Sequence, residues 1–484
     1  MSRVFGPSQG VRAAVAGTLM LALSACAVGP EFQRPAVPTV DHYGEKTLPT
    51  TVGEDGAPPQ QLLSGATVPA DWWTLFQSPA LNSAIEQALA NNQNVAAARA
   101  SVQQAQALVE ARTGARYPQL DLDASIGRQK LGSRFLGTFP KPPPFTYYAF
   151  GPAVSYTLDY TGGIKRSIEQ QLALADYQRQ ESQATQITVA GNVVLQALSV
   201  AAHQAEIDTM EELLADDRKN VEMIQAAFEA GSLNKVDVLI AQSQLANDET
   251  LLPPIKKQLG AARNALAVLM GQPPSALGAS QLDLAAFTLP AQIPVSLPSD
   301  LVHRRPDILA AESQLHAATA AVGVATANLY PRITLTAGFS QESVNTNTLF
   351  DSENSAWNLI GNLTAPLFDG GRLRAEKRAA AAALAVQAAR YQQVVLESFA
   401  QVADALDAVQ HSSEQMAAQE KALSVAQENL ELTRESLKEG FANVLQVLDS
   451  ERLYQQARLG HVRAQAQRLA DTAQLFVALG GSQP

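Results

Sequence analysis

Apolar and polar residues alternate in four short stretches of this chain, which form two pairs. The first pair covers residues 120–126 and 150–158, and the second covers residues 333–340 and 357–364. A period of two predicts a β-strand with one apolar face and one polar face. We therefore expect two strand pairs, the first joined by a Pro-rich loop and the second by residues 345–355.

Long helical stretches follow the strand pairs. No proline occurs between Gly163 and Ala230 or between Gly371 and Glu439, and each stretch would be roughly 100 Å long as a helix. Apolar residues recur at heptad spacing in the second stretch and in the segment that returns after the first: Val395, Val402, Val409, Met416, Leu423, Leu430 and Leu437; Val238, Leu245, Leu252, Leu259 and Leu266. A heptad seam keeps facing a partner when helices supercoil, so we predict coiled coils.

The chain is an internal duplication. Tyr117-Pro118 before the first strand pair matches Tyr330-Pro331 before the second, and Gly231 at the end of the first long helix matches Gly440 at the end of the second. We place the first repeat at 69–296 and the second at 297–484. Shorter helices precede each strand pair, a Pro-rich link spans 271–298, and Pro253-Pro254 should kink or break the first returning helix.

Each long helix ends at a glycine, which readily takes the left-handed conformation that stops a helix. The turns contain Gly231 and Ser232 in the first copy and Gly440 and Ala442 in the second. We predict that these four residues form the tips of two helical hairpins.

The strands admit two interpretations. They are either an ordinary half-buried sheet or membrane-crossing strands, since each is close to the about 9–11 residues that a tilted strand needs to cross a bilayer. Four strands are too few to close a barrel, because the smallest barrels have about eight. A barrel would therefore require several copies of the chain.

The N-terminus reads as a secretory signal over residues 1–25. Arg3 and Arg12 precede an apolar run at 13–23 that is too short for a permanent membrane helix. The only cysteine, Cys26, follows small residues at the end of this run, which is typical of a bacterial lipobox; a free buried thiol is the alternative. Residues 26–68, rich in Pro, Gly and Thr, should form an extended, lipid-anchored arm.

Composition and charge narrow the function. The net charge of −11 disfavours nucleic acid as a partner, because phosphate would be repelled. The six histidines are scattered, a single cysteine forms no disulfide or zinc set, and no nucleophile elbow or phosphate loop occurs. We therefore expect no enzymatic activity, no catalytic residues, no metal site and no cofactor.

The chain resembles the TolC-like outer-membrane channel proteins of efflux and secretion systems, in particular their NodT-type lipoprotein branch. The resemblance covers nearly everything after residue 22. It is carried by five motifs taken together and in order: Ser24-Ala25-Cys26-Ala27-Val28-Gly29-Pro30 with Gln33-Arg34-Pro35; Trp72-Trp73; Arg304-Arg305-Pro306-Asp307-Ile308; Pro366-Leu367-Phe368-Asp369-Gly370-Gly371; and Val447-Leu448-Asp449.

This resemblance implies a mainly helical fold with a β-barrel part. Three copies would form a twelve-stranded barrel in the outer membrane and a twelve-helix tunnel extending into the periplasm. It further implies lipidation at Cys26, partnership with a periplasmic adaptor protein and an inner-membrane pump, and a narrow opening at Leu445 and Asp449. Ile240 takes the place of Asp449 in the first copy, so only the second hairpin could supply an acidic ring.

A second hypothesis from another class is a lipid-anchored coiled-coil spacer in the periplasm. It accounts for Cys26 and for the heptads. It leaves the four amphipathic strands without a role, and ion conductance would distinguish it from a channel.

Overall fold

The computed structural model describes residues 27–36, 40, 42–44, 51–53, 58–130, 143–277 and 282–480. The chain divides into two compact units, each assembled from both halves of the sequence. The first unit takes Val102–Tyr177 and Ala311–Tyr391 together with residues up to Arg34. The second takes Pro35–Ser101, Gln178–Ala310 and the residues from Gln392 onward.

Both halves contain shorter helices, then a pair of long strands, then a long helix and a returning helical segment. The first half contains β1 (Thr51–Val52), β2 (Gln60–Ser64), η1 (Trp72–Phe76), α2 (Pro79–Asn91), α3 (Gln93–Gly114), β3 (Gln119–Gln129), β4 (Phe145–Leu158), α5 (Gly163–Glu229), α6 (Lys235–Glu249) and α7 (Leu252–Leu269). The rest contains η2 (Pro274–Ala276), η3 (Leu284–Ala286), β5 (Gln292–Val295), α8 (Pro298–Arg304), α9 (Pro306–Ala327), β6 (Arg332–Ser343), η4 (Thr346–Thr348), η5 (Ser352–Asn354), β7 (Ser355–Thr364), α10 (Arg372–Lys438) and α11 (Val444–Ala478).

The two long helices are unbroken, as predicted. Helices α5 and α10 each have 67 residues. The predicted break at the proline pair is also confirmed, since α6 ends at Glu249 and α7 begins at Leu252 with the prolines in its first turn. The matching helix of the second copy, α11, runs through 35 residues without interruption. The predicted seam on α10 is buried at Val395, Val402, Val409, Met416 and Leu430.

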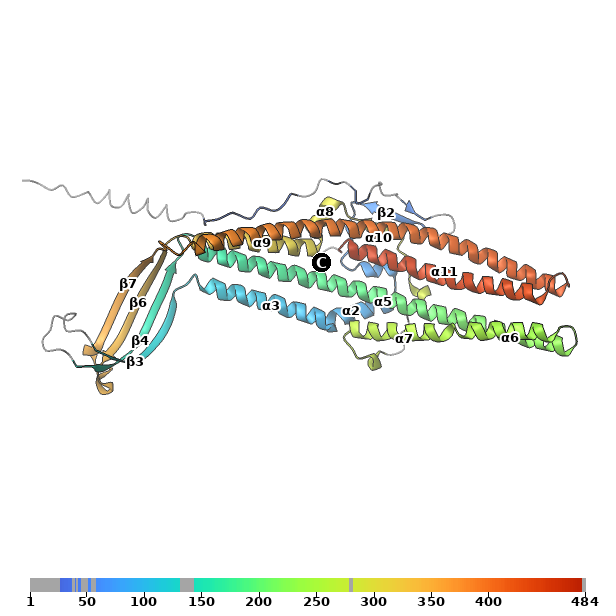
Figure 1. Cartoon of the computed structure of the whole chain (residues 1–484), viewed down its shortest axis with the longest axis horizontal. Helices are drawn as coiled ribbons and strands as arrows, with labels where there is room; N and C mark the ends of the chain where they lie inside the picture. The colour runs from blue at the N-terminus through green and yellow to red at the C-terminus, as the bar shows by residue number, and fades with distance from the viewer. Residues whose placement is uncertain are drawn as a thin grey trace, which may run out of the picture. The chain divides into compact units, whose positions relative to one another are not determined.

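The four long strands form one antiparallel sheet in the order β3-β4-β6-β7 (Figure 1). Strand β4 of the first repeat pairs with strand β6 of the second repeat. The register aligns Leu120, Val154, Ala337 and Leu359 in a single row across all four strands. Because side chains alternate between faces, every apolar position predicted from the sequence falls on the same face of this sheet. One face of the sheet is therefore apolar from edge to edge, and both repeats contribute residues to it.

Each strand pair passes into its long helix through an aspartate cap. Asp159 accepts hydrogen bonds from the backbone N–H groups of Ile164 and Lys165 at 2.9 and 2.8 Å. Asp369 accepts hydrogen bonds from the N–H groups of Gly371, just before α10, and of Leu373 in its first turn, at 2.9 and 2.8 Å. These bonds hold the pKa of the Asp369 carboxyl below its usual value and satisfy N–H groups that a helix start leaves free.

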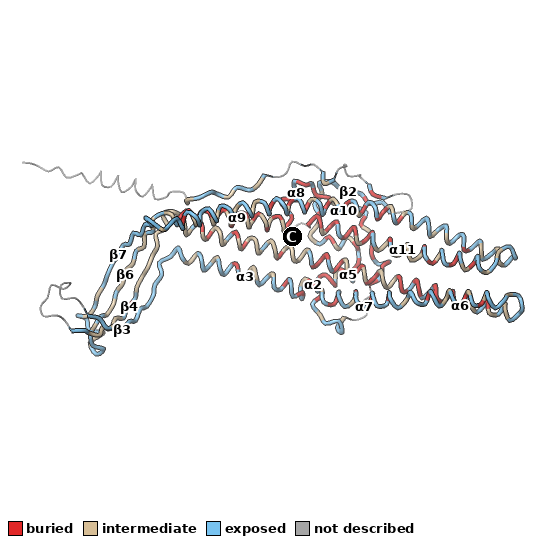
Figure 2. Tube along the Cα trace, in the orientation of Figure 1, coloured by how far each residue is buried: buried red, intermediate tan, exposed pale blue. Residues whose placement is uncertain are grey.

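A second, smaller sheet lies in the second compact unit. It has the order β1-β2-β5, with β2 and β5 parallel. Its neighbourhood holds the main core, where Trp72 and Phe76 pack against Phe476 of α11 with ring centroids 5.4 and 6.3 Å apart. Figure 2 shows buried residues gathered in this region and mainly exposed or half-buried residues toward the hairpin ends. The sequence pattern did not predict these strands, because they are too short to show a period.

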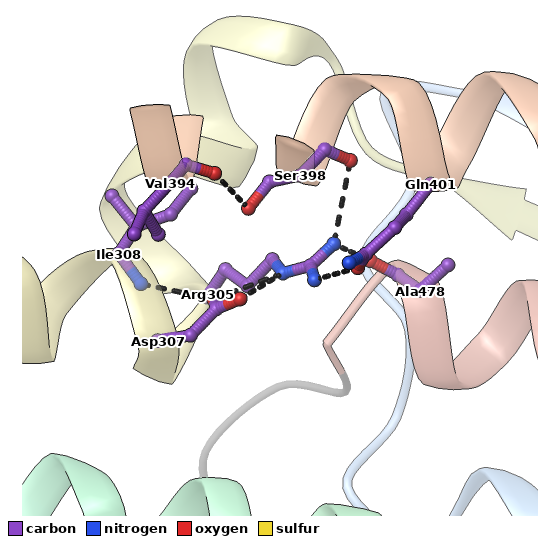
Figure 3. A network of polar contacts seen from close by, with 7 residues as sticks. All are labelled: Arg305, Asp307, Ile308, Val394, Ser398, Gln401 and Ala478. Carbon is purple, nitrogen blue, oxygen red and sulfur yellow. Dashed lines mark hydrogen bonds and ion pairs between the residues drawn. The ribbon is translucent and has the colours of Figure 1, made fainter. Parts of the chain in front are cut away.

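The motif around Arg305 ties three helices of this unit together (Figure 3). The guanidinium donates through Nη1 to the backbone oxygens of Ala478, at 2.7 Å, and Ser398, at 3.4 Å. Nε forms an ion pair with Asp307 at 2.9 Å, and Nη2 reaches Gln401. Arg305 thus links the start of α9 to α10 and to the last turn of α11, where a cation also favours the helix dipole.

Candidate functional site

The two predicted hairpin tips have the same backbone geometry. Gly231 has φ +76° and Gly440 has φ +83°. In the first turn the N–H of Ser232 donates to the oxygen of Ala227 at 2.9 Å. In the second, the N–H of Phe441 donates to the oxygen of Ser436 at 2.8 Å. With a second bond from each glycine N–H, this pattern is a Schellman motif, which a left-handed residue completes.

An asparagine caps the start of the helix that follows each turn. Asn234 caps α6 and Asn443 caps α11, and each forms a reciprocal capping box with the third helical residue, Asp237 or Gln446. Each hairpin end is therefore defined by a glycine stop and an asparagine start. Matching the two caps pairs Ile240 with Asp449, in agreement with the alignment made from the sequence.

The tip residues are accessible. Gly231, Ser232 and Gly440 are exposed and Ala442 is half-buried. A side chain added at Gly231 or Gly440 would meet no atom within 4 Å. Phe441, beside the second glycine, is 83% exposed. The turns are thus exposed surfaces in the single chain.

A pocket of about 620 Å³ lies between the two hairpin ends. Its walls are mainly apolar, and they come from the first hairpin and from both helices of the second: Met223, Ile224, Ala227 and Leu233; Leu437, Val444, Val447 and Leu448. Lys219, Arg434 and Lys438 also line it, with Asp216 as the acidic residue. The sequence analysis did not predict this pocket, because its walls come from segments far apart in the chain.

The predicted aperture residues lie on one exposed face of α11. Leu445 is 49% exposed, and the Asp449 side chain lies one helical turn further on. The Asp449 carboxylate is paired with Arg452 through Nη2 at 2.8 Å. The sequence analysis missed Arg452, although an acid and an arginine three residues apart on a helix were the available signal.

Polar contacts between α5 and α11 join the two hairpins. Arg463 pairs with Glu206 at 3.1 Å, and Arg458 pairs with Glu212 at 2.7 Å. Closer to the tips, Asn220 donates to Glu451 at 2.7 Å. The hairpins are therefore connected along their length by ionic and amide pairs as well as by apolar packing.

Cys26, the predicted lipidation site, lies outside the described residues. The residues that follow it are held firmly against the first unit. The N–H of Val28 donates to the oxygen of Thr161 at 3.0 Å, Phe32 stacks on His316 with ring centroids 4.4 Å apart, and Arg34 pairs with Glu312 at 2.7 Å. Residue 27 is thereby fixed beside the turn between β4 and α5.

Metal ligands do not cluster in the described part of the chain. No group of three His, Cys, Asp or Glu side chains within it is placed to hold a metal ion. The candidate site consists of the exposed hairpin turns, the apolar pocket between them and the Asp449–Arg452 ion pair.

Comparison with known proteins gives consistent relatives. The family model described as outer membrane efflux protein matches residues 84–272 and 297–481. The chain is 31% identical over 454 residues to the pyoverdine export outer membrane protein OpmQ of Pseudomonas aeruginosa, covering 89% of this chain and 94% of that protein. It is 29% identical over 468 residues to the cation efflux system protein CusC of Escherichia coli K12, covering 95% and 97%.

Solved structures agree with this. The structure of the outer-membrane channel OprN superposes with a TM-score of 0.83 at 26% identity, covering 94% of this chain and 99% of that one. The structure of CusC superposes with a TM-score of 0.80 at 26% identity, covering 94% and 100%. The chain therefore belongs to the outer membrane efflux protein family, and it is the outer-membrane channel component of an efflux system.

Proposed function

We propose that three copies of this chain form one passive channel through the outer membrane, supplied by an inner-membrane pump through a periplasmic adaptor. The sheet carries this proposal. Within the described residues, strands β3 and β7 are its edges and pair with one neighbour each. Four strands close no barrel, so copies of the chain must supply the missing partners, and three copies give twelve strands.

The apolar face of the sheet supports membrane insertion. Leu120 and Leu359, at its two edges, are 70% and 74% exposed in the single chain. Apolar residues this exposed, repeated along both edge strands, would be unfavourable in water and are suited to lipid. The spacer hypothesis gives this face no role, whereas the channel uses it directly.

The channel experiment is a conductance measurement. Purified full-length protein reconstituted into a planar bilayer should give discrete conductance steps, and chemical cross-linking should stop at trimers. A periplasmic spacer would leave the bilayer silent. Monomers that conduct, or larger closed assemblies, would contradict the trimer.

The mature N-terminus should be an acylated Cys26. The contacts of residues 27–34 support this proposal, because they hold Ala27 beside the strand-to-helix turn, where the membrane boundary is expected. Mass spectrometry of the purified protein should find a diacylglyceryl-modified, acylated cysteine. A mature chain that begins elsewhere with no lipid would contradict the proposal.

The adaptor should bind the hairpin ends. The exposed turns at Gly231, Ser232, Gly440 and Ala442 and the pocket between them form a surface that an apolar helical tip would fill. A photo-cross-linking residue at Ser232 or Ala442 should capture the cognate adaptor in cells. The same residue placed at Leu172, an exposed position on α5 in the first unit, should not. Absence of an adaptor adduct from both tip positions would contradict the assignment.

Leu445 and Asp449 should line the narrowest opening. Three carboxylates around one axis would repel one another and favour cations, while Arg452 beside each of them reduces that effect. We expect Asp449→Ala to lower cation preference and Leu445→Ala to raise conductance in single-channel recordings. Unchanged selectivity and conductance in both variants would show that the opening lies elsewhere.

The relatives' names concern different cargo, including pyoverdine, cations and toluene. Channels of this fold thus serve chemically unlike compounds. We infer that the pump, rather than this chain, selects the substrate.

A further inference from the structure

Three carboxylates are buried together where α5, α6 and α11 meet. Asp217 is 5% exposed, Asp248 is 8% exposed and Glu451 is 5% exposed. They come from both hairpins, since α5 and α6 form the first and α11 belongs to the second. The cluster contains none of the residues proposed for the tips or the opening, and no step of conduction described above uses it.

The groups that face these carboxylates are mainly amides. Gln455 of α11 donates through Nε2 to both oxygens of Asp217, at 3.1 and 3.2 Å. Gln244 of α6 donates to Asp248 at 2.7 Å. Glu451 forms an ion pair with Arg434 of α10 at 2.8 Å, and it also accepts a hydrogen bond from Asn220 of α5 at 2.7 Å.

The charges around the cluster do not balance it. The nearby basic residues on α5 form ion pairs at the surface and not with the cluster. Lys219 pairs with Asp216 and Arg218 pairs with Glu249, and all four residues are exposed. Among the described contacts, Asp217 and Asp248 are thus left with amide donors and with each other. A buried carboxyl that faces another carboxylate and has no cation beside it is expected to hold its proton to higher pH. Burial, and then the charges of Asp248 and Glu451, raise the pKa of Asp217 to about 7.

We propose that a proton held between Asp217 and Asp248 latches the first hairpin to α11, and that loss of this proton loosens the contact between the two hairpins. With the proton in place, one carboxyl can donate to the other while Gln455 reaches across from α11. Without it, the carboxylates of Asp217 and Asp248 on the first hairpin face the carboxylate of Glu451 on α11. Their repulsion in a poorly hydrated site acts against the packing of α11 on α5 and outweighs the stronger bond that an ionised Asp217 accepts from Gln455.

The sign of the pH dependence follows from this. A carboxyl whose pKa is higher in the packed state than in the open state stabilises the packed state when the pH is low. That stabilisation declines as the pH rises from the ordinary carboxyl range toward about 7 and is lost above it. The hairpins should therefore be tightly joined in mildly acidic medium and looser in mildly alkaline medium. The link from this latch to channel opening, and only that link, rests on the proposed function, because α11 also carries Leu445 and Asp449.

Hydrogen exchange on the purified full chain tests the latch. Exchange is measured at about pH 6 and about pH 8.5, and rates are corrected for the intrinsic effect of pH. In the wild type, backbone protection in residues 236–250 and 445–457 should fall by about tenfold or more at the higher pH. Asp217→Asn keeps the shape but does not titrate; its amide can accept from Gln455 through Oδ1 and donate to Asp248 through Nδ2. Its protection should therefore stay high at both pH values.

Asp216→Asn is the matched control, because it removes the same charge from the neighbouring exposed residue. It should keep the pH dependence of the wild type. Equal wild-type protection at both pH values, or an Asp217→Asn variant as pH-dependent as the wild type, would overturn the latch. Should Asp217→Asn fail to fold, Asp248→Asn removes the charge that faces Asp217 and should weaken the pH dependence of protection; an unchanged pH dependence in that variant would overturn the latch.

Conductance separates the latch from its consequence. Single-channel conductance that rises with pH in the wild type but not in Asp217→Asn would tie the latch to opening. Exchange that depends on pH while conductance does not would overturn that tie and leave the latch between hairpins standing. A silent bilayer would instead contradict the proposed channel, independently of the exchange result.

Discussion

At the scale of single residues, Arg305 joins distant segments of the second unit through one side chain. It is buried, and it donates to Ala478 and Ser398 while pairing with Asp307. Arg305→Met would fill similar volume but leave the Ala478 carbonyl and the Asp307 carboxylate without their partner. Leaving a buried acceptor without its donor costs about 1–3 kcal/mol, and the half-exposed Asp307 adds little because water can solvate it. We expect a marked fall in the midpoint of thermal unfolding in detergent.

The neighbouring arginine is the natural control for that experiment. Arg304 is exposed and donates only to Thr67 among its described contacts. Arg304→Met should change stability by less than about 1 kcal/mol, as exposed polar contacts usually do. Equal effects of the two substitutions would mean that Arg305 contributes through charge alone and not through its buried contacts.

At the scale of elements, each hairpin turn has a glycine in the left-handed backbone conformation with open space around it. Gly231→Leu and Gly440→Leu would each force a leucine into the left-handed region, at a cost of about 1–2 kcal/mol. No atom obstructs the new side chain, so the fold and the trimer should persist. Export should nevertheless be abolished, because the added bulk would occupy the surface proposed for the adaptor. Efflux in cells and cross-linked trimers measure the two properties separately.

Gly260 gives a control of the same chemistry in another setting. It lies in α7, it also has open space around its added Cβ, and it has no left-handed φ. Gly260→Leu should preserve export and stabilise the helix by up to about 1 kcal/mol. Export that survives both turn substitutions would remove the tips from the adaptor contact.

At the scale of the whole molecule, the apolar face of the sheet should decide whether the chain enters the membrane. Leu359→Arg places a charge in the middle of β7 on that face, where the cost in lipid is about 2–4 kcal/mol. We expect less protein in the outer-membrane fraction and fewer trimers. Asn358→Arg, one residue earlier on the opposite face, should insert almost normally. Equal insertion of the two variants would show that this face does not meet lipid.

The sequence by itself determined the local structure. Period-two alternation located all four long strands, the heptads located the buried seam of α10, and Pro253-Pro254 located the break between α6 and α7. Gly231 and Gly440 located the hairpin turns. Each of these signals acts within a few residues, through side-chain direction, backbone freedom or a missing N–H group, so it can be read without knowing the fold. The family motifs then supplied the channel and the candidate opening.

The tertiary structure decided everything that depends on distant segments meeting. The pairing of β4 with β6, the parallel contact of β2 with β5 and the reach of Arg305 to Ala478 left no trace in local pattern. Asp217, Asp248 and Glu451 are unremarkable acids on three separate helices until packing buries them together. Their altered chemistry arises from burial and from one another's charge, and both are properties of the folded arrangement rather than of any stretch of sequence.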